Sequence, residues 1–319
     1  MLTLLLLSCM KTAPPPTAPV LHGGPGLSAE LVSSGSIAER VSGPDDSDLV
    51  IHYTGEFKGD VAPCGCSDAP RGGLPRAAAY LESAGGGLRI VGASWLDDGT
   101  QLDGQPMADA AVKNAHMVSG LLAMSIDAVH VGLADAIALA RLDAPPPVPM
   151  VSANITGPGI EPFLIVEQGD RRIAITGLAA PGHPAIATPG YDRTDPLDVL
   201  EVIQAAADAS DVVVLLNDGA TAATKRVLRA VNIGVVIETA RVRGLEAPFR
   251  LSGAVWVRSH DQGQRLGELR LGLEGNRVHT ARDRKIDLDA SVPDHEGLGA
   301  IARDAAAQLK ALDRALFAP

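Results

Sequence analysis

The sequence predicts an α/β protein, in which strands alternate with helices around a largely buried sheet. Apolar segments of strand length alternate with segments of helical periodicity along the chain from about residue 47. Some strand segments, such as "DVVVLL" at 211–216, are continuously apolar, which is typical of strands covered on both faces. Hydrophobic residues make up 46% of the 319 residues but aromatic residues only 3%, so aliphatic side chains must build the core.

The first half of this region begins with "DLVIHY" (48–53), a short apolar run of strand type. "LPRAAAYLESA" (74–84) has helical spacing with Pro75 near its start, where the missing N–H costs nothing. "MADAAVKNAHMVSGLLAM" (107–124) has the spacing of an amphipathic helix, and a shorter helical stretch ends at Leu142. The other strands expected in this half are 88–93, 126–131 and 149–154.

The second half begins with "FLIVEQGDRRIAITGL" (163–178), which is typical of a hairpin that turns at Gly169-Asp170. Helical periodicity then predicts helices, and short apolar runs predict strands, in alternation. The expected helices are 196–209, 221–231 and about 295–316, and the expected strands are 211–216, 233–238, 253–258 and 265–273. No long linker or repeat divides residues 47–317, so we expect a single domain there.

The charge of the chain excludes some classes of partner. Its formal net charge is −11 and its isoelectric point is about 5.1. A phosphate backbone requires a basic protein face, so we expect no nucleic-acid partner. No internal apolar run approaches the roughly 20 residues that a membrane span needs.

The N-terminus predicts a lipid anchor. "MLTLLLLSC" (1–9) is an apolar run that ends in Leu6-Leu7-Ser8-Cys9, which resembles a bacterial lipobox and predicts a signal peptide with lipidation at Cys9. The run lacks a basic n-region, which an upstream start would explain; a chance hydrophobic start is the alternative. Residues 10–46, rich in Pro, Gly and Ser, are expected to be a linker. The expected location is the bacterial cell envelope, anchored to a membrane on the periplasmic face or at the outer membrane.

Several motifs together resemble the calcineurin-like metallophosphoesterases, in particular the N-terminal domain of the 5′-nucleotidase and UDP-sugar hydrolase branch. The resemblance covers about residues 48–275 and depends on the order and spacing of the motifs. They are "GGLPRAAAYL", "MVSGLLAMSIDAVHVG", "VPMVSANIT", "RRIAITGLAAP", "ADASDVVVLLNDG" and "QGQRLGELRLGL". The resemblance implies an α/β/β/α sandwich of two sheets flanked by helices.

The resemblance also implies a two-metal phosphoesterase centre, whose ligand motifs this chain has altered. In place of the family's Asp-x-His-Gly this chain has Glu56-Phe57-Lys58-Gly59, and in place of Gly-Asn-His-Asp/Glu it has Gly132-Leu133-Ala134-Asp135. Asp218 stands where the family has a further histidine, and Thr239-Ala240-Arg241-Val242 replaces the family's Gly-His-x-His. Asp97 or Asp98 approximates the aspartate that bridges the two metals. Because every histidine ligand is replaced, Glu56, Asp135 and Asp218 are interpreted as degraded metal positions. We expect no metal cofactor, and we expect His52, His130 and His260 to be structural.

Cations now stand near those positions. Lys58, Arg241 and Arg243 can attract a phosphate or carboxylate, for which Arg offers a bidentate fork. The alternative is that they pair with Glu56, Asp135 or Asp218 and fill an inactive site.

Two of the three cysteines, Cys64 and Cys66, lie one residue apart in a loop rich in Gly and Pro. A Cys-x-Cys disulfide closes a very small ring, which should be strained and easily reduced. Lys58 and the N-terminus of the helix at 74–84 are both expected to lower the pKa of a nearby thiol below its reference of about 8.5. A static disulfide and a metal-binding pair are the alternatives.

The loop also resembles a branch of bacterial lipoproteins on this fold that carries Pro-Cys-Gly-Cys, some members having selenocysteine. That resemblance implies thiol redox chemistry with Cys64 and Cys66 as catalytic residues, and a redox partner. Two other functions stay open. One is a non-catalytic anion-binding or scaffold pseudoenzyme, and the other is residual 5′-nucleotidase-type hydrolysis.

Overall fold

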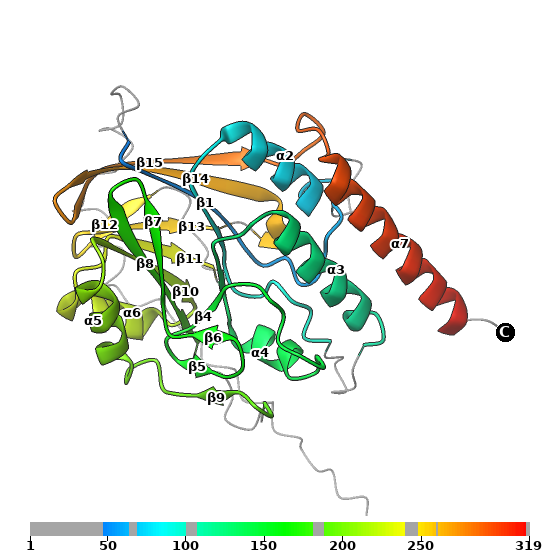
Figure 1. Ribbon diagram of the computed structural model, residues 1–319, viewed down its shortest axis with the longest axis horizontal. Helices are drawn as coiled ribbons and strands as arrows, with labels where there is room; N and C mark the ends of the chain where they lie inside the picture. The colour runs from blue at the N-terminus through cyan, green and yellow to red at the C-terminus, as the bar shows by residue number, and fades with distance from the viewer. Residues whose placement is uncertain are drawn as a thin grey trace, which may run out of the picture. The chain divides into compact units, whose positions relative to one another are not determined.

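The computed structural model describes residues 47–63, 69–99, 107–180, 188–239, 248–259 and 261–316. Within these residues two mixed sheets pack face to face, and helices cover the outer face of each (Figure 1). Aliphatic side chains from both sheets, such as Ile51, Val214 and Leu269, form the layer between them. The fold is therefore the expected α/β/β/α two-sheet sandwich.

The larger sheet has seven strands in the order β15-β14-β1-β2-β3-β4-β6. The strands β1, β2, β3, β4 and β6 run parallel, whereas β14 and β15 form an antiparallel hairpin on the edge next to β1. These strands are β1 (Leu49–Thr54), β2 (Leu88–Val91), β3 (Ala128–His130), β4 (Met150–Val151), β6 (Ile160–Glu161), β14 (Arg265–Glu274) and β15 (Arg277–Asp287).

The smaller sheet has six strands in the order β12-β13-β11-β10-β8-β7. Its four central strands run parallel, and an antiparallel strand closes each edge. These strands are β7 (Leu164–Gln168), β8 (Arg171–Ala179), β10 (Val212–Asp218), β11 (Val235–Glu238), β12 (Phe249–Leu251) and β13 (Ala254–Arg258), while β5 (Ile155–Thr156) and β9 (Asp192–Arg193) form a separate pair. The continuous apolar run of β10 reflects its burial on both faces.

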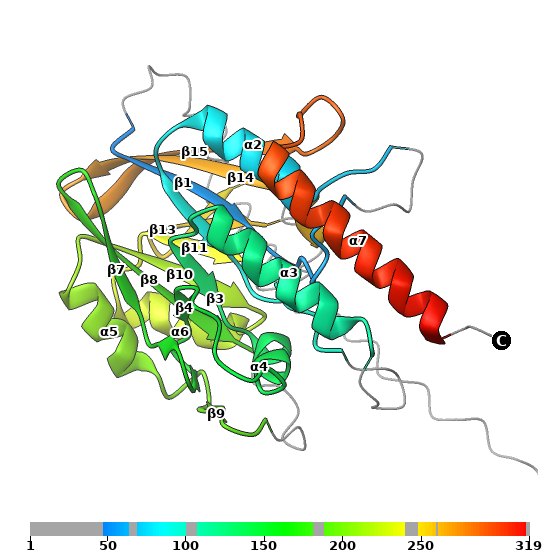
Figure 2. The ribbon, with the colours of Figure 1, turned by 45° about the vertical axis from the view of Figure 1, so that its right-hand side comes forward.

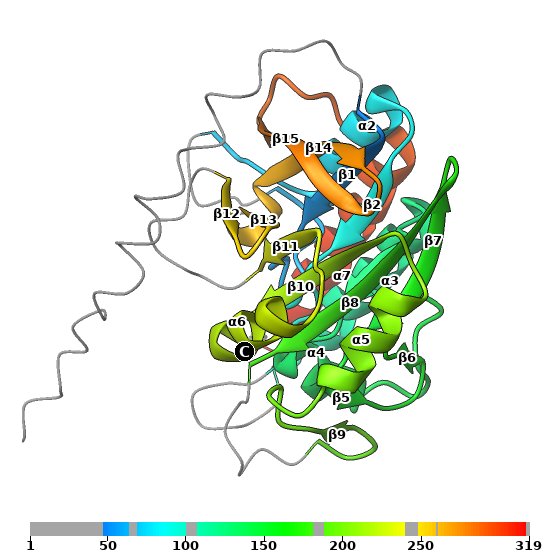
Figure 3. The ribbon, with the colours of Figure 1, turned by 90° about the vertical axis from the view of Figure 1, so that its left-hand side faces the viewer.

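Three helices, α2 (Leu74–Ala84), α3 (Ala110–Ala123) and α7 (Glu296–Leu316), cover the seven-stranded sheet side by side (Figure 2). Helices α5 (Leu200–Asp208) and α6 (Thr221–Ala230) cover the six-stranded sheet on the opposite side (Figure 3). A short helix, α4 (Leu133–Leu139), follows β3, and a 3₁₀ turn spans Asp261–Gly263. Among the described residues, no helix combines the length and apolar character needed to cross a membrane.

Most predicted elements are confirmed, including the hairpin of β7 and β8 and the bounds of α2. Gly73, the residue before α2, has φ 91° and packs so closely on Pro63 that an added Cβ would lie 2.8 Å from the Pro63 nitrogen. Only glycine adopts this backbone conformation without strain in so little space. Pro75 follows in the first turn of α2, where a proline is tolerated.

The strand predicted at 149–154 is wrong in its second half, because β4 ends at Val151. From there the chain turns towards the other sheet, where the Ala153 N–H donates to the Gly177 carbonyl at 2.7 Å. The Asn154 side chain then bonds to both backbone groups of Ala179, at 2.9 Å and 3.0 Å. These bonds to β8 replace the ladder that a longer β4 would have made.

Strand β15 was not predicted, nor were the short strands β6, β9 and β12. Only Val278 and Ala281 are buried in β15, and charged side chains occupy much of the rest. Charges are common on edge strands, because they discourage pairing with another molecule, and they hide the apolar alternation that predicts a strand. The sequence signal for β15 was Gly275 in the turn before it, where φ is 60° and glycine is favoured.

Candidate functional site

Loops from the two sheets meet where the carboxyl ends of their parallel strands come together. Gly92, after β2, lies against Thr239, which follows β11. Gly132, after β3, lies against Asp218 at the end of β10, and a Cβ on Gly132 would be 2.5 Å from Asp218 Oδ2. The absence of side chains at these two glycines lets the loops approach closely, so residues far apart in sequence form one site.

Asp135 is fully buried at this edge and is held by backbone donors. It lies in the first turn of α4, and its carboxylate accepts hydrogen bonds from the N–H groups of Ser94 at 2.8 Å, Leu96 at 3.0 Å and Gly132 at 3.0 Å. Burial raises the pKa of Asp135 to about 7, against the opposing effect of these hydrogen bonds and with a further rise from Asp218. Asp135 therefore ties the loop after β2 to the start of α4.

Asp218 lies beside Asp135, so two carboxylates share the site. Asp218 is partly buried, and burial raises its pKa to about 6. Both pKa values therefore lie near neutral pH, and the nearby Asp218 disfavours ionisation of Asp135. The site thus brings together two acidic groups whose surroundings favour the protonated form.

Backbone strain concentrates in the same loops. Glu56, Lys58 and Ser94 all have positive φ, of 55°, 51° and 60°, although none is a glycine. The loops are fixed together because the Lys58 N–H donates to the Ser94 carbonyl at 2.9 Å and the Glu56 N–H donates to the Ala93 carbonyl at 3.1 Å. Such strain persists only where surrounding structure imposes it, and it gathers at functional sites. The Glu56 side chain is buried and the Lys58 side chain is exposed.

A buried polar chain lies behind Asp218 and was not predicted from the sequence. Asn217 donates from Nδ2 to Glu238 Oε2 at 2.5 Å and accepts from the Thr224 hydroxyl at 2.9 Å. All three residues are buried, at the ends of β10 and β11 and in α6. A signal was available, since Asn217 and Glu238 each end a run of apolar residues, and polar groups in such places need buried partners.

Asp97, considered as a bridging aspartate, lies at a different point of the loop after β2. Its carboxylate pairs with Lys113 at 3.1 Å and accepts from the Gly99 N–H at 2.9 Å. Its backbone N–H donates to Asn114 at 2.8 Å. These bonds join the loop to α3, so Asp97 acts there as an anchor. Ala93, Trp95 and Leu96 of the same loop are fully buried.

The predicted structural histidines are buried in the fold. His130 is fully buried against Gly177 of the other sheet, and burial lowers its pKa to about 3. His52 packs edge-on against Tyr80, and burial lowers its pKa as well. Both rings are thus neutral at physiological pH. His260 lies outside the described residues.

The described residues do not fit a two-metal centre. In the described part of the chain, no group of three or more His, Cys, Asp or Glu side chains is arranged to hold a metal ion. Both oxygens of Asp135 already accept backbone hydrogen bonds, so this carboxylate is engaged within the protein.

Several predicted residues lie outside the described residues, namely Cys9, Cys64, Cys66, Arg241 and Arg243. The structure does describe both flanks of the cysteine segment 64–68. On its N-terminal side, the Val61 carbonyl accepts from the Leu74 N–H at 3.0 Å. On its C-terminal side, the Pro70 carbonyl accepts from Arg76 at 2.6 Å. Both flanks are therefore fixed to the first turn of α2, whose N-terminus has no side-chain cap.

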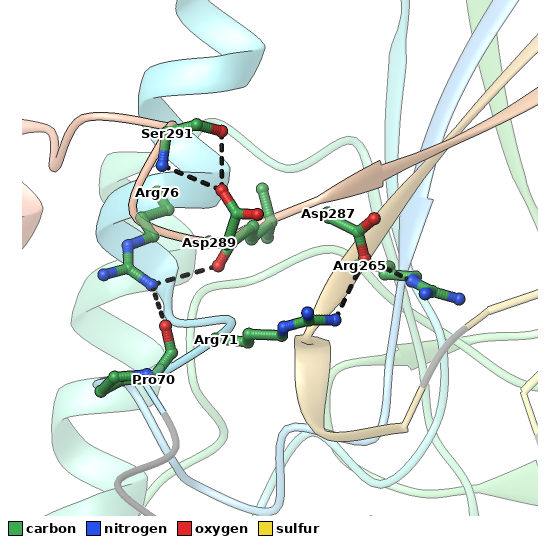
Figure 4. A network of polar contacts seen from close by, with 8 residues as sticks. Pro70, Arg71, Arg76, Arg265, Asp287, Asp289 and Ser291 are labelled. Carbon is green, nitrogen blue, oxygen red and sulfur yellow. Dashed lines mark hydrogen bonds and ion pairs between the residues drawn. The ribbon is translucent and has the colours of Figure 1, made fainter. Parts of the chain in front are cut away.

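Two arginines organise this junction (Figure 4). Arg76 also donates to the Leu288 carbonyl at 3.1 Å and lies 3.5 Å from an Asp294 oxygen. Arg71 lies 3.7 Å from Asp287, which Arg265 also contacts. Ser291 bonds Asp289 nearby, and these bonds, together with Arg71 and Arg76, lower the pKa of the Asp289 carboxyl. The network joins the flank of the cysteine segment to the segment between β15 and α7.

Comparisons of sequence find no relative, since no protein-family model and no curated protein matches the chain. Comparisons of structure do find relatives in fold. A 5′-nucleotidase precursor from Thermus thermophilus superposes with a TM-score of 0.64 at 16% identity, over 83% of this chain and 60% of that one. The sulfate thiohydrolase SoxB of the same organism gives 0.66 at 16% identity, over 83% and 61%.

A third solved structure is of similar size to this chain. The calcineurin-like phosphoesterase YfkN from Bacillus subtilis superposes with a TM-score of 0.59 at 16% identity, over 82% of this chain and 97% of that structure. The chain spans only about three fifths of the two Thermus proteins. At these identities the likeness concerns the fold, and the fold of this chain is that of the metallophosphoesterases and of the N-terminal domain of 5′-nucleotidases.

Proposed function

We propose that this protein is a lipid-anchored envelope protein that acts through Cys64 and Cys66 as a reactive thiol and disulfide pair on a phosphoesterase-type scaffold. The observation that carries the proposal is the anchoring of both flanks of the cysteine segment at the uncapped N-terminus of α2. A helix N-terminus favours negative charge, so it stabilises a thiolate near it. Arg71 and Arg76 lie at the same flank, where Asp287 and Asp294 pair with them.

The proposed chemistry is thiol–disulfide exchange. One thiolate attacks a disulfide sulfur of a partner protein, forming a mixed disulfide and releasing one partner thiolate, which takes up a proton. The second cysteine then attacks the mixed disulfide and releases the other partner thiol. Two electrons pass to the partner, and Cys64 and Cys66 end as a disulfide in a small, strained ring. A second dithiol protein reduces this ring by the same exchange and is itself oxidised to a disulfide, which returns Cys64 and Cys66 to thiols and closes the cycle.

The degraded metal positions support this proposal indirectly. Backbone donors occupy the Asp135 carboxylate, and among the described residues no group of three or more His, Cys, Asp or Glu side chains could hold a metal ion. The scaffold then holds the cysteine segment without the hydrolytic chemistry that its fold relatives are named for.

The test is the rate of alkylation by iodoacetamide, measured for each cysteine by mass spectrometry from about pH 5 to about pH 9. A stabilised thiolate reacts at a lower pH than the thiol of an unstructured peptide with the same Cys-Gly-Cys sequence. Cys64→Ser and Cys66→Ser assign the reaction to one sulfur, and Cys9→Ser excludes any contribution from the third cysteine. Equal rates for the protein and the peptide would contradict the proposal.

A second candidate function is binding of an anionic ligand by Lys58, Arg241 and Arg243. The observation that favours it is the exposed Lys58 side chain on a backbone that its neighbours hold in a strained conformation. Calorimetric titration with AMP tests it, with Lys58→Gln compared to Lys225→Gln on α6, which changes the charge equally. Loss of binding in Lys58→Gln alone would support this function, and equal binding by both variants would contradict it.

A further inference from the structure

A group of arginines lies on the helix-covered face of the seven-stranded sheet, at its hairpin edge. In the register of β14 and β15, Arg270 stands directly opposite Arg282, and Glu268 stands directly opposite Arg284. Residues two apart on a strand share a face, so these four side chains form one cluster. They line a cavity of about 160 Å³.

Glu268 is the acidic member of this cluster, and its carboxylate is already occupied. Its side chain is only 3% exposed, with Oε1 bonded to Arg270 at 2.9 Å and Oε2 bonded to the Tyr80 hydroxyl at 2.5 Å. Arg284 lies 3.2 Å from Oε2 and also donates to the Tyr80 hydroxyl at 2.6 Å. These partners lower the pKa of Glu268 to about 2 in spite of its burial. Glu268 is therefore ionised and fixed in place.

The cavity keeps an excess of positive charge. Three arginines and one glutamate line it, so basic side chains outnumber acidic ones on its wall. Within the described residues, Arg282 makes no ion pair or side-chain hydrogen bond. Like charges directly opposite each other on adjacent strands destabilise a sheet, so the pairing of Arg270 with Arg282 has an electrostatic cost.

We propose that this cavity, lined by Arg270, Arg282 and Arg284, is a binding site for a small oxyanion, namely a phosphate or sulfate group. Arginine offers a planar fork of N–H donors that matches the oxygens of such a group. A volume of about 160 Å³ accommodates one tetrahedral oxyanion with a few waters, since one water occupies about 30 Å³ in the liquid. The bound anion neutralises the repulsion between Arg270 and Arg282.

The scaffold preorganises the site. Glu268 and Tyr80 orient Arg270 and Arg284 from beneath, so these guanidinium groups lose little freedom when an anion binds. Arg282 lies on the edge strand β15 and supplies the third donor. The site differs from the strand-end site of Asp135 and Asp218, because its residues come from β14 and β15.

The oxyanion could be free or could belong to a phospholipid headgroup, and two binding measurements on the full chain separate these sources. The first is calorimetric titration with inorganic phosphate and with sulfate, at an ionic strength held constant with chloride. The second is co-sedimentation with vesicles of phosphatidylcholine alone and of phosphatidylcholine with phosphatidic acid.

Arg282→Gln is the test variant and Arg277→Gln is its matched control. Both remove one exposed arginine from β15, but Arg277 lies opposite Glu274 and does not line the cavity. We expect Arg282→Gln to weaken phosphate binding by at least about tenfold, as loss of a charged hydrogen bond predicts, and Arg277→Gln to change it by less than about twofold. Without phosphate, Arg282→Gln should melt no lower than the natural protein, because it removes a like-charge pair.

Arginine-dependent binding of inorganic phosphate or sulfate supports the proposal with a free anion as ligand. Binding only to vesicles with phosphatidic acid, again lost in Arg282→Gln, supports it with a headgroup as ligand. Equal weakening in both variants, unchanged binding in Arg282→Gln, or no binding to any of these probes would overturn it.

Discussion

Asp135 and Asp218 face each other across Gly132, where a Cβ would lie 2.5 Å from Asp218 Oδ2 and 3.4 Å from Asp135 Oδ2. The two carboxylates come from opposite sheets of the sandwich and share one largely buried space. Their surroundings differ. Three backbone N–H groups donate hydrogen bonds to the Asp135 carboxylate, whereas burial is what raises the pKa of Asp218. The two residues should therefore respond in opposite ways to the same substitution.

Asp218→Asn should stabilise the protein above neutral pH. Folding raises the pKa of Asp218 from 3.8 to about 6, so its stabilising contribution is complete below about pH 4 and is lost as pH rises through about 6. An amide carries no charge, so the variant should gain on the order of 2 kcal/mol at pH 8 and nothing near pH 3. Urea unfolding over this pH range measures the free energy of unfolding of the natural protein and of the variant. A difference between the two that stays constant with pH would contradict the raised pKa of Asp218.

Near pH 5, where its charge is largely absent in the wild-type fold, Asp135→Asn should instead destabilise the protein by about 1–3 kcal/mol. An amide has one acceptor oxygen, so its NH₂ group would face at least one of the backbone N–H donors of Ser94, Leu96 and Gly132. The free energy of unfolding near pH 5, where both carboxyls are largely protonated, isolates this effect from charge repulsion. Asp218→Asn is the matched control, and equal effects of the two variants would be inconsistent with the backbone cradle.

The purified protein should hold no stoichiometric Mn, Fe or Zn, and should not hydrolyse nucleotides or a chromogenic phosphate ester above background. Asp135 has both oxygens committed to backbone donors, and Lys58 places a cation at the same edge. Metal analysis by mass spectrometry and a phosphatase assay check the two halves of this prediction. Two tightly bound metal equivalents, with activity that a chelator abolishes, would show that a hydrolytic centre survives.

The periodicity of the sequence was sufficient to predict the layers of the fold. Helix α2 has a regular apolar face and Pro75 in its first turn, and β10 is continuously apolar, so local pattern and tertiary position agree. Strand β15 was missed because an edge strand needs few buried residues and this one carries many charges. The break after Val151 was missed because the bonds of Asn154 to Ala179 are made with the other sheet.

The candidate site was less accessible to sequence analysis. Motif positions identified Asp135 and Asp218, but the meeting of the two carboxylates depends on close approach at Gly132, which no local pattern encodes. The commitment of Asp97 to Lys113 likewise depends on how α3 packs. The arginine cavity depends on the register of the hairpin that was only half predicted. Contacts of long sequence separation are what a single sequence leaves undetermined.

Cys9→Ser should change the location of the protein. If Cys9 is lipidated, the natural chain, expressed in a bacterial host from its natural gene, should partition into detergent. The Cys9→Ser variant should appear in the soluble periplasmic fraction, because it lacks the acyl chains that hold it to a membrane. Cys64→Ser, made in parallel, controls for the loss of a thiol. Identical partitioning of the natural protein and Cys9→Ser would exclude the anchor.

The reduction potential of the Cys64 and Cys66 pair tests the central claim most directly. A glutathione or dithiothreitol redox titration of the full chain, followed by mass-tagging of free thiols, yields the midpoint, with Cys64→Ser and Cys66→Ser as controls. A structural disulfide of an exported protein has a potential below about −300 mV, whereas a strained, exposed one lies higher. We expect a midpoint well above about −300 mV and full reversibility. A pair that resists reduction throughout the titration, or that never forms a disulfide, would contradict a thiol-based function.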